Sequence, residues 1–182
     1  MTKAIFFDRD GVLNYTVKRG NGQTAPWTFK EFKMIPGSIE AVQKAKDMGY
    51  MALVVTNQPD VKANRMKKEE LEKIHKSLIG WLHVDEIMYA EDRDSDMYKP
   101  NNGMVEFYIN KYNLDRTQCF MIGDKWKDIV CGHKSGLKNI FIGKDYINLC
   151  PTEYLHISPD YMVDDVLSAV NKIGELNDQV VQ

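Results

Sequence analysis

Short, continuous apolar runs alternate along this 182-residue chain with stretches whose apolar residues recur at helical spacing. Continuous runs of this kind are typical of strands buried on both faces of a parallel sheet. We predict six such strands, at Ala4–Phe7, Met51–Thr56, Glu86–Ala90, Cys119–Gly123, Asn139–Ile142 and Tyr161–Val163. Right-handed connections place the carboxyl ends of parallel strands at one edge of the sheet, where ligands bind near the topological switch point.

The helical stretches fall between these strands. Ser38 is expected to cap a helix that closes near Gly49. Further helices are predicted at Lys67–Leu82, at Gly103–Asn113, from about Lys127 to Gly136, and over the stretch marked by Val166, Leu167, Val170 and Ile173. This alternation predicts an α/β fold: a Rossmann-like, mostly parallel sheet with helices on both faces.

Two stretches, Asn14–Ile35 and Glu91–Pro100, lack a regular pattern. Both follow predicted strand ends, so both are expected to border the ligand-binding edge. Neither reaches the roughly 50 residues of a small domain. We therefore expect a single domain over residues 1–182, with minimal or no cap, whose site is open or roofed only by these two loops.

Composition and charge exclude several classes of function. The formal net charge of −2 argues against a nucleic-acid-binding protein, which would usually be strongly basic. No apolar run approaches the roughly 20 residues of a membrane span, and the first predicted strand begins too early for a signal peptide. The three cysteines form no Cys-x-x-Cys pair, which favours reduced thiols in a cytoplasm. The oligomeric state stays open.

Four predicted strands end in polar residues that suit one another chemically: Asp8 and Asp10, Thr56 and Asn57, Lys99, and Asp124 with Asp128. Because two neighbouring carboxylates repel each other, such a group favours a bound cation. The set matches the needs of phosphoryl transfer, which requires an oxygen nucleophile, a proton donor for the leaving oxygen and neutralising charge.

Each residue can be given a role in that reaction. Asp8 is the candidate nucleophile, and Asp10 the acid that protonates the leaving group and then deprotonates water. The carboxylates of Asp8 and Asp124, with the carbonyl oxygen of Asp10, are expected to bind Mg²⁺, which prefers oxygen ligands. Thr56 is expected to hydrogen-bond the phosphoryl group and Lys99 to neutralise it while holding Asp8 ionised.

The remaining candidates are assigned supporting roles around the reacting groups. Asp128 is expected to orient Lys99 or a metal-bound water. Five further side chains are candidates for substrate recognition, with solvent-exposed surface as the alternative for those on loops: Asn57, Lys18, Arg19, Trp27 and Arg65. Arg65 and its neighbour Lys62 are considered for a second anionic group of the substrate.

Four segments resemble, in order and spacing, the four motifs of the haloacid dehalogenase-like phosphohydrolases: Phe6–Asn14, Val54–Gln58, Lys99–Met104 and Ile122–Ile129. Together they resemble the branch of D-glycero-D-manno-heptose bisphosphate phosphatases and histidinol-phosphate phosphatases. The resemblance implies a Rossmann-like sheet with almost no cap domain, in agreement with the short irregular stretches.

The chain departs from that branch in two places. Many of its members carry a structural zinc loop of cysteines and a histidine, whereas residues 91–98 contain neither, so we predict no zinc there. Tyr98 stands where heptose bisphosphate phosphatases have an arginine that contacts substrate, which weakens a heptose bisphosphate assignment.

The sequence thus predicts a Mg²⁺-dependent phosphatase that acts through an aspartyl-phosphate on a small phosphorylated metabolite, with a sugar phosphate preferred. Histidinol phosphate, nucleotides and phosphorylated nucleic-acid ends remain alternative substrates. A receiver-like domain that keeps its aspartyl-phosphate as a switch is a second hypothesis, which Asp10 disfavours. A catalytically idle scaffold is a third.

Overall fold

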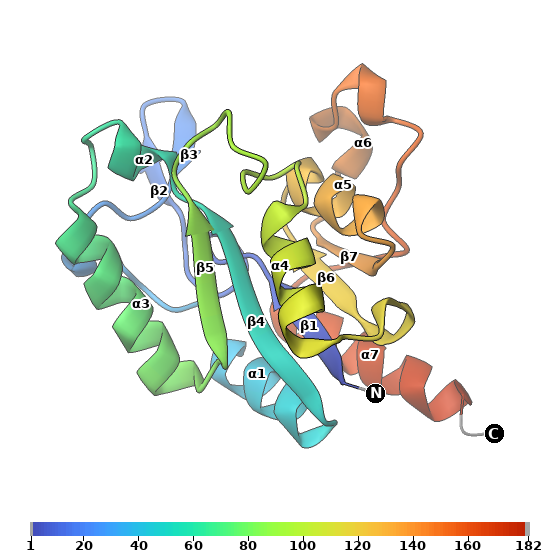
Figure 1. Cartoon of the computed structure of the whole chain (residues 1–182). Helices are drawn as coiled ribbons and strands as arrows, with labels where there is room; N and C mark the ends of the chain where they lie inside the picture. Colours follow the sequence, from blue (N-terminus) through green and yellow to red (C-terminus); the bar gives the residue numbers. More distant parts are fainter. Residues whose placement is uncertain (1, 181–182) are drawn as a thin grey trace.

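All six predicted strands are present and form one parallel sheet in the order β5-β4-β1-β6-β7-β8 (Figure 1). The computed structural model describes residues 2–180, so the termini of the predicted 1–182 domain lie outside the described residues. The strands are β1 (Lys3–Phe7), β4 (Tyr50–Asn57), β5 (Glu86–Ala90), β6 (Phe120–Gly123), β7 (Lys138–Ile142) and β8 (Tyr161–Val163). The predicted α/β class is confirmed.

Strand β1 shows why the sheet is covered on both faces. Its side chains alternate, so Ile5 and Phe7 enter one apolar layer while Ala4 and Phe6 enter the other. All four are fully buried. A strand with two buried faces reads as an unbroken apolar run, which is the pattern that the sequence displays.

Helices cover both faces of the sheet (Figure 1). Helices α1 (Ser38–Asp47), α3 (Lys68–Leu82) and α7 (Val166–Val180) pack on one face. Helices α4 (Gly103–Tyr112) and α5 (Trp126–Lys134) pack on the other. Short helices α2 (Pro59–Lys62) and α6 (Tyr146–Leu149), and 3₁₀ turns at Phe29–Glu31, Arg116–Gln118 and Thr152–Tyr154, complete the helical elements.

The predicted cap of the first helix is wrong by one residue. Gly37, with φ of 84°, is the N-cap, and Ser38 is the first helical residue. The Ser38 hydroxyl is not free to cap the helix because it donates a 3.0 Å hydrogen bond to the carbonyl oxygen of Leu13. That bond ties the start of α1 to the loop that follows β1.

The loop after β1 contains a small antiparallel hairpin, β2 (Val17–Arg19) paired with β3 (Gly22–Thr24), which the sequence pattern did not predict. Its strands have three residues each and no buried residue, so no apolar alternation marks them. The hairpin stands above the carboxyl end of the sheet, in blue beside α2 in Figure 1. It is the only added sheet among the described residues, consistent with a minimal cap.

The strand order reverses beside β1. The chain runs from β1 outward to β4 and β5, and then returns to place β6, β7 and β8 on the other side. The carboxyl ends of β1 and β6 therefore border the switch point at which doubly wound sheets bind ligands.

Two further expectations concern the cysteines and the membrane. Cys119, Cys131 and Cys150 are buried and unpaired, as predicted for reduced thiols. Within residues 2–180, none of the helices combines the length and apolarity that crossing a membrane requires.

Candidate active site

Lys99 connects two carboxylates at the switch point. Its Nζ lies 2.8 Å from Oδ1 of Asp8 and 2.6 Å from Oδ1 of Asp128, and it also donates to the carbonyl oxygen of Val55 at 2.7 Å. All three charged side chains are buried. Burial alone would lower the pKa of Lys99, but the charges of Asp128 and Asp8 outweigh it and raise that pKa. Lys99 is therefore held as a cation against Asp8.

Asp8 is fixed by the sheet itself. It follows β1 directly, and its backbone N–H donates to the carbonyl oxygen of Ile122 on β6 at 2.9 Å. The ion pair with Lys99 occupies Oδ1, and Oδ2 has no hydrogen bond to any described residue. One oxygen of the carboxylate is thus oriented while the other is left available.

Three carboxylates crowd together beside Lys99. Oxygens of Asp8, Asp124 and Asp128 lie within 4.8 Å of one another. The pKa of Asp124 is raised to about 7, chiefly by burial and then by the charges of Asp8 and Asp128, against the opposing charge of Lys125. Such a cluster is stabilised by a cation.

Lys125 supplies a cation to this cluster in the described structure. Its Nζ lies 3.3 Å from Oδ1 of Asp124 and 3.5 Å from the carbonyl oxygen of Asp10. Burial would lower the pKa of Lys125, but Asp124 and the neighbouring carboxylates raise it. The ammonium thus lies between two of the oxygens that the sequence assigned to Mg²⁺.

A glycine makes this close approach possible. Gly11 has φ of 93°, a conformation that L-residues with side chains rarely adopt. A Cβ at this position would lie 2.1 Å from Oδ2 of Asp124. The glycine after the two aspartates is therefore needed to let Asp124 reach the site.

Asp10 is held by donors that the sequence argument did not assign. Both of its oxygens accept from Arg9 Nη2 at 2.9 Å, with further bonds from Asn14 at 2.9 Å and Gln58 at 2.7 Å. These three residues belong to the motif segments Phe6–Asn14 and Val54–Gln58, so their position in the motifs was the available signal.

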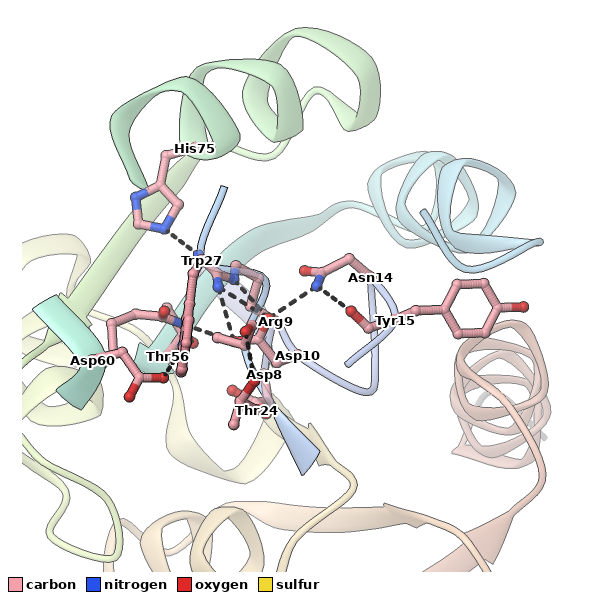
Figure 2. Close-up of polar contacts among 12 residues, drawn as sticks. Asp8, Arg9, Asp10, Asn14, Tyr15, Thr24, Trp27, Thr56, Asp60 and His75 are labelled. Atoms are coloured by element: carbon pink, nitrogen blue, oxygen red, sulfur yellow. Dashed lines mark hydrogen bonds and ion pairs between the residues drawn. The ribbon is translucent and has the colours of Figure 1, made fainter. Parts of the chain in front are cut away.

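The side chain of Arg9 is itself positioned by a hydrogen bond to His75 (Figure 2). Its Nη1 donates to Nε2 of His75 on α3 at 3.1 Å, and the Arg9 side chain is fully buried. Burial, followed by the charge of Arg9, lowers the pKa of His75 to about 3. The imidazole is therefore neutral and can accept this hydrogen bond.

Thr56 and Asn57, at the end of β4, face the same site. Thr56 is buried, and its hydroxyl oxygen accepts from Gln58 at 2.9 Å. The amide of Asn57 exchanges two 2.9 Å hydrogen bonds with the backbone of Lys99. Asn57 therefore anchors the Lys99 loop to the sheet.

A cavity of about 410 Å³ opens over this site, and its floor is formed by Asp8, Asp10, Thr56, Asn57, Lys99, Lys125 and Asp128. Its walls come from the two irregular stretches and the start of α5, with the lining residues Thr16, Gln23, Thr24, Ala25, Arg93, Tyr98, Trp126 and Lys127. The expectation that both loops border the site is confirmed. Lys127 also lines the cavity, and its place in the motif segment Ile122–Ile129 was the available signal, whereas nothing in the sequence argument marked Arg93.

The candidate recognition residues are placed differently from one another. Arg65 lines the cavity and donates to Asp60 at 2.7 Å. Lys18 is exposed on β2 outside the cavity lining. Arg19 also lies outside it, paired with Glu31 at 2.6 Å and 3.8 Å above the Trp27 ring.

Comparison with known proteins agrees with this architecture. The model of the HAD-hydrolase-like family matches residues 97–169. The D-glycero-beta-D-manno-heptose-1,7-bisphosphate 7-phosphatase of Pasteurella multocida is 32% identical over 79% of this chain and 83% of its own length. The corresponding phosphatase of Chlorobaculum tepidum is 30% identical over 92% of both chains.

A solved structure shares the fold. The D,D-heptose 1,7-bisphosphate phosphatase of B. bronchiseptica, complexed with magnesium and phosphate, superimposes with a TM-score of 0.78 at 19% identity, covering 96% of this chain and 99% of that one. Fold and relatives together place this chain among the haloacid dehalogenase-like hydrolases. Within them, its relatives are D-glycero-D-manno-heptose bisphosphate phosphatases, which belong to the branch that the motifs resemble together with the histidinol-phosphate phosphatases.

Proposed function

We propose that the protein is a Mg²⁺-dependent phosphatase that hydrolyses a small sugar phosphate through an aspartyl-phosphate on Asp8. The observation that carries the proposal is the convergence of Asp8, Lys99, Asp124 and Asp128 at the switch point. The names of the relatives make a heptose 1,7-bisphosphate the first substrate to test.

In the first half-reaction, the free oxygen of Asp8 attacks phosphorus and the bond between phosphorus and the ester oxygen breaks. Asp10 gives its proton to the departing oxygen. Lys99 and the Thr56 hydroxyl stabilise the charge on the phosphoryl oxygens. Arg9, Asn14 and Gln58 keep the Asp10 carboxyl in place for this transfer.

In the second half-reaction, Asp10 takes a proton from water, whose oxygen then attacks the phosphorus of the aspartyl-phosphate. The bond to Asp8 breaks, so the carboxylate is regenerated and inorganic phosphate leaves. The proton that Asp10 gains replaces the one that it gave away. Asp10 is thus ready for another turnover.

The donor set fits a hard divalent cation. The carboxylates of Asp8 and Asp124 and the carbonyl of Asp10 are oxygen donors, as Mg²⁺ requires, and the Lys125 ammonium already lies against two of them. When bound, Mg²⁺ would neutralise charge on the nucleophile and the phosphoryl group. Asp128 would then hold Lys99 beside that charge rather than bind the ion itself.

Replacement of Asp8 tests the nucleophile. We expect Asp8→Asn to abolish Mg²⁺-dependent phosphate release from heptose 1,7-bisphosphate, because the amide cannot form the acyl phosphate. Circular dichroism should show an intact fold. As a matched control, Asp164→Asn neutralises an exposed aspartate outside the cavity and should keep full turnover. Substantial residual activity in Asp8→Asn would contradict the proposal.

The lifetime of the phosphoenzyme separates an enzyme from a switch. Asp10 lies two residues from Asp8 in the same cavity, which supports rapid hydrolysis. In a quench experiment with labelled substrate, we expect the aspartyl-phosphate to decay within seconds. A phosphoenzyme stable for hours would favour the receiver-like alternative.

A further inference from the structure

A buried arginine connects helix α3 to the carboxylate of Asp10 (Figure 2). Nη1 of Arg9 donates to Nε2 of His75 at 3.1 Å, while Nη2 donates to both carboxylate oxygens of Asp10 at 2.9 Å. Nε adds a longer bond of 3.2 Å to Oδ1 of Asp10. Among residues 2–180, no other group accepts a hydrogen bond from the Arg9 side chain, so its orientation depends on these two partners.

The planar guanidinium of Arg9 makes the two contacts depend on each other. Its N–H donors form a rigid fork, so a hydrogen bond at Nη1 sets the plane in which the Nε and Nη2 donors lie. The side chain of Arg9 is fully buried, so bulk water does not replace an acceptor that is lost at Nη1. Loss of the His75 contact should therefore loosen the contact with Asp10.

Arg9 also differs from the other two donors to Asp10. Asn14 contacts only Oδ1, at 2.9 Å, and Gln58 contacts only Oδ2, at 2.7 Å. Arg9 alone contacts both oxygens. The rotation of the Asp10 carboxyl group about its bond to Cβ is thus fixed chiefly by Arg9.

His75 can accept this hydrogen bond only in its neutral form. Arginine has donors and no acceptor, so Nε2 of His75 carries the lone pair and the ring proton lies on Nδ1. Burial, and then the charge of Arg9, lower the pKa of His75 to about 3, so the ring is neutral near pH 7. The ring also packs beside that of Tyr89, with centroids 5.7 Å apart, which restricts its orientation.

We propose that His75 is a positioning residue of acid–base catalysis: through Arg9, it fixes the Asp10 carboxyl in the orientation from which it protonates the leaving oxygen. The inference rests on the proposed function, because it takes Asp10 as the acid and the base. It adds to that reaction a residue of α3, which lies outside the four motif segments. The alternative is a structural role, in which His75 only satisfies a buried donor.

Leaving groups of different basicity separate these two roles. The sugar oxygen of heptose 1,7-bisphosphate needs a proton in order to leave, whereas p-nitrophenyl phosphate releases a stable phenolate that needs none. His75→Leu removes the acceptor and fills the space. We expect it to lower kcat/KM about 100-fold for the sugar phosphate but less than about threefold for p-nitrophenyl phosphate. Phenyl phosphate, whose leaving group is intermediate, should lose roughly tenfold.

Rescue by a conservative variant assigns the effect to Nε2. The amide oxygen of His75→Gln can accept from Arg9, so this variant should stay within about threefold of the unmodified protein for all three substrates. As a control, Leu82→Ala destabilises the core at the far end of α3 and should leave the ratios of kcat/KM among the substrates unchanged. An equal loss for all three substrates in His75→Leu, or no rescue by glutamine, would overturn the proposal.

The second half-reaction provides an independent readout. With p-nitrophenyl phosphate, formation of the aspartyl-phosphate does not need a proton from Asp10, whereas its hydrolysis needs Asp10 as the base. Rapid-quench measurements should therefore show that the phosphoenzyme accumulates in His75→Leu but not in His75→Gln or the unmodified protein. An unchanged level of phosphoenzyme in His75→Leu would contradict the positioning role.

Failure of the proposed function gives a different result. If the unmodified protein hydrolyses none of the three esters, the phosphatase assignment fails, and nitrogen NMR of His75 still tests the contact with Arg9. We expect the tautomer with its proton on Nδ1, and a proton on Nε2 would overturn the inference. If all three esters are hydrolysed and His75→Leu loses the same factor on each, the phosphatase assignment stands and the positioning role is rejected.

Discussion

The floor and the rim of the cavity are built by different means. The charged centre of the floor comprises Asp8 after β1, Lys99 in the loop after β5 and Asp128 on α5, and short ion pairs join these three buried side chains. The rim, which comprises the 14–35 stretch and residues 91–98, is mostly exposed and is held by isolated contacts. One such contact is the 2.9 Å hydrogen bond from Trp27 to Asp60 (Figure 2).

This difference indicates that the floor and the rim serve different purposes. Groups that must meet a reacting phosphorus atom need fixed geometry, which strands of a buried sheet provide. Groups that select a substrate can lie on loops, whose sequence varies without disturbing the sheet. Changes to the floor should therefore affect kcat and stability together, whereas changes to the rim should affect KM or substrate preference.

The largest effect is expected for Lys99→Met. It removes the cation between buried Asp8 and Asp128, so we expect kcat to fall roughly 1,000-fold. Unpaired buried charge should also reduce the free energy of unfolding by about 3 kcal/mol. Steady-state kinetics and urea denaturation measure the two effects. Lys62→Met, which breaks an exposed pair with Asp92, should change neither. If Lys99→Met and Lys62→Met changed kcat and the free energy of unfolding equally, the distinction between floor and rim would be disproved.

Alanine substitutions at two glycines, Gly11 and Gly20, distinguish the effect of a steric clash from the effect of backbone strain. Gly11→Ala should lower kcat/KM about 100-fold, because the new Cβ would displace Asp124 and weaken the cation site. Gly20→Ala, on the hairpin of the rim, also has a positive φ (57°), but nothing lies within 4 Å of its added Cβ. We expect Gly20→Ala to lower the free energy of unfolding but to leave kcat/KM unchanged. Measuring kcat/KM and the apparent Mg²⁺ affinity of both variants shows whether steric contact with Asp124 or backbone strain causes the loss.

His75 extends the floor behind Asp10. Its pKa is about 3 in the folded protein and near 6.5 when unfolded, so between these values the unfolded chain binds a proton that the folded chain does not. Stability therefore falls as the pH drops through this window, by about 3 kcal/mol between pH 6.5 and pH 4. His75→Gln keeps a neutral acceptor for Arg9 and should flatten that dependence.

The control for this prediction is His133→Gln, which changes an exposed histidine of α5. Denaturation curves at several pH values should show that it retains the pH dependence of the unmodified protein. If His75→Gln retained this pH dependence too, the neutral state of His75 in the folded protein would be disproved.

The smallest effect is expected on the rim. Trp27→Phe removes the hydrogen bond to Asp60, and we expect KM to rise about threefold with kcat unchanged. Trp81→Phe is the matched control, because Trp81 stacks on Phe32 away from the cavity. A fall in kcat for Trp27→Phe would show that the rim also positions the reacting groups.

The sequence determined the sheet and the residues of the floor. Six apolar runs predicted six parallel strands, because a strand buried on both faces has no room for polar side chains. The motif residues then followed from the rule that parallel strands end at one edge. Ser38 was misplaced as a cap because its hydroxyl bonds to Leu13, a partner that is distant in the chain.

Only the tertiary structure decided which side chains support the floor and which remain unpaired on the rim. The contact between Arg9 and His75 spans 66 residues of sequence. The ring of Tyr98 lies near Arg93 of its own loop and near Lys127 of α5, which share no sequence pattern. Local periodicity reflects which face of an element is buried, whereas the partner of a polar side chain depends on how distant elements pack. For that reason the convergence of the polar residues that follow the strands could be predicted from the sequence, whereas the partners of each polar side chain required the fold.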